Sequence, residues 1–305
     1  MATMSGLALS PIAPVLGQRI PLRGPPRLLY RSYARHHCPS GILVRKVTTQ
    51  LGDDFSVDMS SWLEWQLWAF GGYEDHLGQL FGYLVADGDR CIDVGANIGI
   101  HTVRLAKLAG ARGSVTAIEA SEELVARARS NYALNKLSNV RLIHAAASRR
   151  GGDSIRLYQP GAGDPNKGRA SMKPHKHLTG PSRLAPTVAI DDLSQEPVSL
   201  IKIDVEGAEE AVIAGARKVI STYNPVIIFE YDPELLTQEP GDTFRWLREQ
   251  GYQFFDTAPE RHPVTGRRHL RLEPLRGLPH RATDILAASE SSLGRVGQFA
   301  GHGLS

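Results

Sequence analysis

From residue 88 onward, short apolar runs alternate with amphipathic segments, and this alternation constrains the fold more than any other feature. Seven apolar runs are expected to be strands, at 90–94, 113–120, 139–148, 199–205, 224–232, 252–257 and 282–289. Helices are expected at 99–110, 121–136, 206–221 and 241–251. Strands and helices that alternate over short connections favour an α/β fold with a mostly parallel sheet and helices on both faces. No helical segment separates the last two runs, so the last strand is predicted to be reversed.

The remaining segments are predicted to be a tail, a flank and a loose end. Residues 1–40 contain several arginines and no acid, as transit peptides do, but Pro11, Pro14, Pro21, Pro25 and Pro26 oppose an amphipathic helix. A disordered basic tail is therefore favoured over a targeting segment. Residues 41–87 are expected to form a hairpin and a serine-capped helix that flank the domain at 88–289. Residues 290–305 are expected to be a loose C-terminal tail.

Charge and cysteine content bound the functional classes. A formal net charge of +3 over 305 residues does not favour a nucleic-acid partner, and no apolar run approaches the roughly 18 residues that a membrane span needs. The two cysteines, Cys38 in the tail and Cys91 in a predicted strand, are poorly placed to pair. A reducing, cytoplasmic location fits this pattern best. The oligomeric state does not follow from the sequence.

The first predicted strand ends in DVGANIG (93–99), which contains one carboxylate and two glycines. Gly95 and Gly99 allow a tight turn and keep side chains away from a ligand, and the next helix begins with free N–H groups. A dinucleotide site would use G-x-G-x-x-G against a pyrophosphate, whereas Asp93 would repel that anion. Asp93 suits a cofactor with a cationic amino-acid end, which S-adenosylmethionine has and NAD lacks. An NAD(P)-dependent oxidoreductase remains the alternative.

The second predicted strand ends at Glu119, 24 residues beyond Gly95. This spacing is close to the roughly 20 residues expected for a carboxylate that binds ribose hydroxyls. The same arrangement occurs in NAD enzymes, so Glu119 does not distinguish the two cofactors. A helix-capping role is the simpler alternative.

A second acidic cluster follows the fourth predicted strand, in LIKIDVEGAE (200–209). Asp204 and Glu206 fall at the carboxyl end of the strand, where they would face the same crevice as Asp93. Glu209 and Glu210 are better explained as favourable charges in the first turn of a helix. Lys202 is an awkward residue among the apolar neighbours of this strand.

Together, DVGANIGIHT and IKIDVEGAE resemble the FkbM-type family of S-adenosylmethionine-dependent methyltransferases, over about Tyr73 to Asp232. The resemblance implies a class I methyltransferase (Rossmann-like) sheet of seven strands with a reversed last strand. It also implies methyl transfer to a hydroxyl of a small molecule, polyketide or sugar. A catalytically silent cofactor-binding scaffold is the alternative from another class of protein.

The same resemblance places the site residues. Asp93, Gly95, Asn97 and Gly99 match the cofactor loop, Glu119 the ribose-binding acid, and Asp204 with Glu206 the strand-four signature. His101, Thr102 and Ala120 complete the expected cofactor set, and His101 would either form a hydrogen bond near the methionine end or be a helix-start residue. The family often has Glu-Pro where this chain has Glu119-Ala120. The third strand is followed by no acid until Asp153, so a contact with the adenine ring cannot be assigned.

A hydroxyl is a poor nucleophile, so a base or a metal ion must help to remove its proton. Asp204, Glu206 and Glu230 are the candidate catalytic acids, and burial in an apolar strand would raise the pKa of Glu230. His175 and His177 form an H-x-H pair without a third ligand near in sequence, so no metal is predicted. The arginine-rich segment before the last strand could attract an acidic substrate, but a solvated basic loop is favoured.

Overall fold

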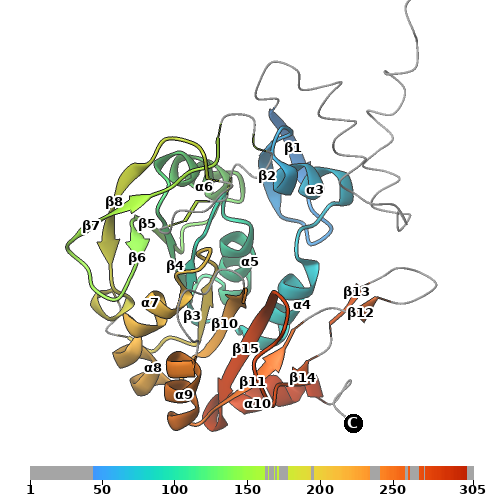
Figure 1. Ribbon diagram of the computed structural model, residues 1–305. Coiled ribbons are helices and arrows are strands. Elements are labelled where there is room, and N and C mark those ends of the chain that lie inside the picture. The colour runs from blue at the N-terminus through green and yellow to red at the C-terminus, as the bar shows by residue number, and fades with distance from the viewer. Residues whose placement is uncertain are drawn as a thin grey trace, which may run out of the picture.

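The computed structural model has one central sheet with the strand order β14-β11-β15-β10-β9-β3-β4-β5 (Figure 1). The parallel strands are β10 (Val226–Tyr231), β9 (Leu200–Ile203), β3 (Arg90–Val94), β4 (Ser114–Glu119) and β5 (Val140–His144). The last long strand, β15 (Thr283–Ser289), runs antiparallel between β10 and β11 (Tyr252–Asp256), which confirms the reversed strand. The two-residue edge strand β14 (Glu273–Pro274) was not predicted and raises the strand count to eight.

The structure describes residues 44–161, 164, 168, 170–171, 178–193, 196–233, 241–257, 260–261, 268–270 and 272–300. The predicted tail at 1–40 lies outside these residues. Among the described residues, no helix has the length and apolar character that crossing a membrane requires.

Helices cover both faces of the sheet, as the alternating pattern predicted. One apolar cluster joins the sheet to α7 (Glu209–Ala214), α8 (Arg217–Tyr223) and α9 (Gly241–Glu249). A second cluster joins the opposite face to α4 (Asp75–Leu84) and α5 (Ile100–Ala109). Because successive strand residues point to opposite faces, Ile92 and Val94 enter the first cluster and Cys91 the second. Asp93 therefore points toward α4 and α5.

The flank consists of a hairpin and two helices. β1 (Val44–Thr48) and β2 (Asp54–Asp58) pair antiparallel, and α3 (Trp62–Phe70) follows them. Ser61 occupies the N-cap position of α3, but its side chain makes no capping hydrogen bond. The hairpin and α3 pack with α6 (Glu122–Leu134) and the start of α5 around a third apolar cluster that contains Phe55, Trp65 and Val103. The sequence interpretation did not identify α4.

The segment between β5 and β9 is more ordered than its irregular sequence suggested. A small sheet of β6 (Ala146–Ala147), β8 (Arg183–Val188) and β7 (Ser154–Leu157) precedes a short 3-10 helix, η1 (Ile190–Asp192). A separate two-stranded pairing joins β12 (Glu260–Arg261) and β13 (Arg268–His269).

The expected loose end after residue 289 is wrong for residues 290–300, which form helix α10 (Glu290–Ala300). Val296 is buried against the cluster that contains α4, and Arg295 donates hydrogen bonds to Asp89 and to the backbone oxygen of Leu84. Two glycines lower the intrinsic helix propensity of this segment. Tertiary packing overrides that weak local signal.

Candidate active site

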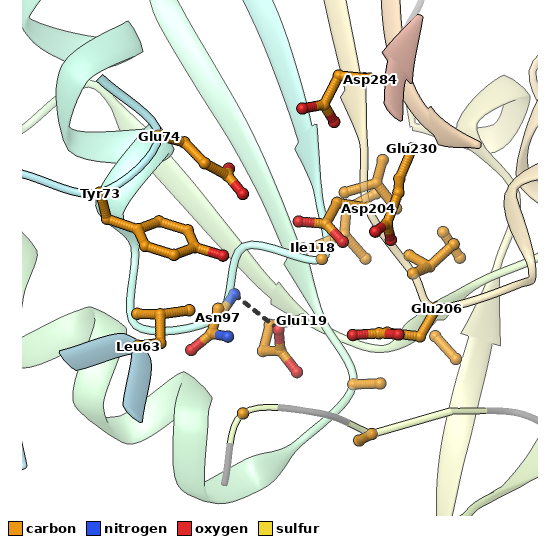
Figure 2. A pocket seen from close by; sticks show the side chains of 18 of the residues that line it. Leu63, Tyr73, Glu74, Asn97, Ile118, Glu119, Asp204, Glu206, Glu230 and Asp284 are labelled. Carbon is orange, nitrogen blue, oxygen red and sulfur yellow. Dashed lines mark hydrogen bonds between the residues drawn. The ribbon is translucent and has the colours of Figure 1, made fainter. Parts of the chain in front are cut away.

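A cavity of about 450 Å³ opens at the carboxyl ends of β3, β4, β9 and β10, beside the amino end of β15 (Figure 2). Ligands of open parallel sheets bind at this edge, and the volume falls in the usual range for small-molecule sites. Six of the lining side chains carry a carboxyl group: Glu74, Glu119, Asp204, Glu206, Glu230 and Asp284.

The glycine loop after β3 forms one wall of the cavity through Gly95 and Asn97. Gly95 has a φ of 78°, and a Cβ atom there would lie 1.8 Å from the backbone oxygen of Asp204. Asn97 also has a positive φ, 54°, and its side-chain oxygen accepts a hydrogen bond from the backbone N–H of Ile98. The loop therefore brings backbone, not side chain, close to the space beside the end of β9.

Glu119 lies at the end of β4 with 7% of its surface exposed, and it lines the cavity as its predicted role requires. One carboxylate oxygen accepts the backbone N–H of Asn97 and the other accepts that of Ser121, each at 2.8 Å. Burial raises the pKa of Glu119, and these N–H bonds oppose the rise. Each oxygen keeps a further lone pair, so the oriented carboxylate can accept the hydroxyls of a cis-diol.

The wall beyond Glu119 is small and apolar. Ala120 lines the cavity, and so do Ala145, Ala146 and Ala147 directly after β5. No polar group was predicted here, and short side chains leave room for a flat ring. This surface could only be found from the structure, because alanine gives no sequence signal for ligand binding.

Asp93 does not line the cavity, which corrects the prediction that it faces a cationic cofactor directly. Its side chain is fully buried on the α4 and α5 face of the sheet. One carboxylate oxygen accepts a hydrogen bond from the Thr102 hydroxyl at 2.5 Å, and the other lies 3.9 Å from Nζ of Lys202. Successive residues of a strand point to opposite faces of the sheet. Asp93 is on the same face as Cys91, so its carboxylate points away from the crevice.

His101, Thr102 and Gly99 lie outside the cavity lining as well. Gly99 is the N-cap of α5, with Tyr132 packed where a Cβ atom would sit. Thr102 binds Asp93, and Nε2 of His101 lies 2.9 Å from Glu74. These three residues support the loop and its neighbours, and the positive φ of Gly99, 91°, agrees with the tight turn expected there. Their predicted contacts with the cofactor stay a prediction.

Asp204 follows β9 and lines the cavity at the position predicted for it. Its carboxylate lies 3.0 Å from Nζ of Lys202, which is 3% exposed and pairs in register with Asp93 on the neighbouring strand. Burial lowers the pKa of Lys202, but the charges of Asp204, Asp93 and Glu74 raise it overall. The awkward lysine is therefore a buried cation beneath the acidic cavity.

Glu230 and Asp284 are directly opposite each other on the antiparallel strands β10 and β15, and both line the cavity. Burial, followed by the charges of Asp204 and Glu206, raises the pKa of Glu230 to about 10. Burial also raises the pKa of Asp284, although a hydrogen bond with His76 opposes the rise. Two carboxylates in such a pair avoid repulsion when one holds a proton. Glu230 is thus protonated at neutral pH.

Glu206 completes the predicted catalytic set, and Figure 2 shows its carboxylate on the same side of the cavity as Glu230. Its backbone has a φ of 52°, and its carbonyl oxygen accepts a hydrogen bond from the Ser171 hydroxyl at 2.9 Å. By contrast, Glu209 points to the backbone, where it accepts N–H bonds from Gly207 and Val205. This geometry agrees with the simple capping role expected for Glu209.

Sequence reasoning missed Tyr73, Glu74 and Asp284, which also line the cavity. Tyr73 and Glu74 belong to the flank, where no local pattern marks a site. Asp284 could have been noticed, because it is an acid at the start of a buried apolar strand, as Glu230 is at the end of one.

The histidine pair and the basic segment before the last strand lie wholly or partly outside the described residues. His175 and His177 lie outside the described residues. Within the described part of the chain, no three His, Cys, Asp or Glu side chains are grouped as a metal site requires. In the basic segment, Arg281 pairs with Asp256 at 2.7 Å, on β11.

The sheet order, the reversed last strand and the glycine loop beside a carboxylate-ended second strand are those of the class I methyltransferase fold. The profile of the methyltransferase FkbM domain matches residues 93–254, which is 162 of the 305 residues. The chain belongs to this family, as the sequence resemblance implied. It is an S-adenosylmethionine-dependent methyltransferase, and the alternative of a nicotinamide-dependent oxidoreductase is set aside.

Several solved structures have a similar fold at low identity. Methyltransferase FkbM from Methylobacillus flagellatus KT is 18% identical, with 68% of this chain and 47% of that chain covered and a TM-score of 0.43. Precorrin-6y C5,15-methyltransferase from Geobacter metallireducens GS-15 is 15% identical, covering 71% and 87%, with a TM-score of 0.42. An rRNA methylase from Streptococcus thermophilus is 12% identical, covering 70% and 95%, with a TM-score of 0.39. None of the curated proteins matches the chain.

The cavity fits S-adenosylmethionine, the cofactor of this family. Glu119 would accept the ribose hydroxyls, the alanines after β5 would leave space for the adenine, and the bare backbone at Gly95 would allow close approach. The carboxylates at the opposite end suit a positively charged group. The residues present therefore agree with the cofactor that family membership requires.

Proposed function

We propose that this enzyme methylates a hydroxyl oxygen on a small molecule, a polyketide or a sugar. The observation that carries the proposal is the convergence of Asp204, Glu206 and Glu230 on one side of the cavity, past Glu119 and Asn97 (Figure 2). A hydroxyl must lose its proton during transfer, and a carboxylate within hydrogen-bond reach can accept that proton. These acids are therefore the catalytic candidates.

The three acids have different protonation states and hence different roles. Glu230 holds a proton at neutral pH, because burial and its acidic neighbours raise its pKa to about 10. It acts as a hydrogen-bond donor and not as the initial base. Asp204 and Glu206 are the proposed bases, and Lys202 fixes the direction of the Asp204 carboxylate. This division replaces the simpler expectation that burial would make Glu230 a base.

Binding and protection from water are the other contributions of the chain. Bound S-adenosylmethionine supplies a methyl group on a positively charged sulfur. Gly95, Asn97, Glu119, Ala120 and Asp204 are the proposed cofactor contacts. Trp62, Leu63 and Tyr73 of the flank line the same cavity, and their rings and apolar atoms exclude water from the reacting groups.

The charge of the cavity also limits the chemical class of the methyl acceptor. The cavity carries six carboxyl groups, so an acceptor with phosphate groups beside the reacting hydroxyl would meet repulsion. A neutral, hydroxyl-rich acceptor is favoured over an acidic one or a nucleic acid.

The test is methyl transfer from labelled S-adenosylmethionine to a panel of neutral polyols, macrolides, nucleotide-sugars and a structured RNA. We expect S-adenosylhomocysteine to form with a neutral hydroxyl acceptor, and Glu206→Gln to slow transfer at least tenfold with unchanged cofactor affinity. Methylation of the RNA alone would overturn the proposal. Cofactor binding without transfer to any acceptor would favour the silent scaffold.

A further inference from the structure

Asp93 is not placed to be the carboxylate that pairs with the positive charge of the cofactor. Asp93 is fully buried, accepts a hydrogen bond from Thr102 and has Lys202 within 3.9 Å. Its side chain does not line the cavity.

Glu74, unlike Asp93, has a side chain at the cavity. It lies between α3 and α4 and lines the cavity together with its neighbour Tyr73. Figure 2 shows its side chain directed into the space that Asp204 and Asn97 enter from other sides. Its partner, His101, is in the first turn of α5, directly after the glycine loop, and holds the Glu74 carboxylate at 2.9 Å. Glu74 is thus fixed to the element that carries the cofactor loop.

The pKa of Glu74 is lowered, whereas the pKa values of Glu119, Glu230 and Asp284 are raised. Burial raises the pKa of Glu74, but the hydrogen bond and charge of His101, with a contribution from Lys202, lower it to about 2. Glu230 is protonated at neutral pH, and Asp204 shares its charge with Lys202. Both oxygens of Glu119 are held by backbone N–H groups. Glu74 is therefore ionised, and His101 holds its carboxylate at the side of the cavity that the flank forms.

We propose that Glu74 binds the positively charged amino-acid end of S-adenosylmethionine, and that the flank thereby completes the cofactor site. The segment matched by the family profile begins at residue 93, so this contact comes from outside the matched domain. The inference depends on the cofactor and not on the identity of the methyl acceptor.

Calorimetry with three probes tests the proposal on the full chain at pH 7.5. S-adenosylmethionine carries an ammonium and a sulfonium, S-adenosylhomocysteine only the ammonium, and 5′-methylthioadenosine neither. For Glu74→Gln we expect S-adenosylmethionine affinity to fall about tenfold or more, with 5′-methylthioadenosine affinity unchanged. An equal fall for S-adenosylhomocysteine assigns the contact to the ammonium, and a fall for S-adenosylmethionine alone assigns it to the sulfonium.

Glu249→Gln is the matched control, because it makes the same substitution and removes the same charge at an exposed position of α9 outside the cavity lining. Its S-adenosylmethionine affinity should equal that of the wild type. The proposal is overturned if Glu74→Gln leaves S-adenosylmethionine affinity unchanged, if 5′-methylthioadenosine affinity falls equally, or if Glu249→Gln has the same effect. The thermal unfolding midpoint of the ligand-free Glu74→Gln variant checks that the flank stays folded. A wild-type chain that binds no S-adenosylmethionine would instead contradict the cofactor assignment.

Discussion

Removing the buried ammonium of Lys202 should destabilise the protein strongly. Lys202 is 3% exposed and lies 3.9 Å from the Asp93 carboxylate and 3.0 Å from that of Asp204. In Lys202→Met the fully buried Asp93 loses its compensating charge, and breaking a buried pair from one side costs about 3–5 kcal/mol. Against a total stability of about 5–15 kcal/mol, this is a large fraction.

The measurement is urea unfolding at pH 7.5, followed by tryptophan fluorescence and circular dichroism in parallel. Lys218→Met, on the exposed side of α8, is the control and should stay within about 0.5 kcal/mol of the wild type. The double variant Asp93→Asn with Lys202→Met should recover part of the lost unfolding free energy, because the buried Asp93 carboxylate that lacks a cation is then replaced by a neutral amide. A loss below about 1 kcal/mol in Lys202→Met would refute this account of the buried network.

Two further predictions follow from the same region. Gly95→Ala should abolish measurable S-adenosylmethionine binding and destabilise the fold more than Gly88→Ala. Both glycines have a positive φ, 78° at Gly95 and 94° at Gly88. The added Cβ atom would lie 1.8 Å from backbone at Gly95, whereas nothing lies within 4 Å at Gly88. Equal unfolding free energies for the two variants would contradict this prediction. Burial and the charges of Asp204 and Glu206 raise the pKa of Glu230 to about 10, so the folded chain keeps a proton that the unfolded chain releases near pH 4.5. Stability should therefore fall as pH rises from 5 to 9, by up to about 1.4 kcal/mol per pH unit, and Glu230→Gln should flatten that slope. Parallel stability profiles for the two proteins, measured by urea unfolding, would show that Glu230 is ionised in the folded state.

The fold was largely predictable because its signals are local. Apolar runs of strand length and amphipathic segments of helix length alternate from residue 88, and the missing crossover before the last run indicated its reversal. The errors lie where local signals are weak or mixed. Helix α10 contains two glycines, and α4 lies in the flank, where only a hairpin and one helix were expected. Both helices are stabilised by burial against the sheet and each other.

Some residues of the candidate site could likewise be predicted from local sequence, and others could not. Gly95, Glu119, Asp204, Glu206 and Glu230 could be named because each stands at or near the end of a predicted strand, and the ends of parallel strands meet at one edge. Glu74 could not, because only the packing of the flank brings it to that edge.

By itself, the sequence determined the family, the cofactor and the edge of the sheet where the chemistry takes place, because these depend on motifs a few residues long. Only the tertiary structure decided which carboxylates face the cavity and which are charged. Asp93 and Asp204 both follow apolar strand residues, yet strand register directs Asp93 to Lys202 inside the core and leaves Asp204 in the cavity. Protonation likewise depends on burial and on neighbours from distant segments, as the pairing of Glu230 with Asp284 and of Glu74 with His101 shows.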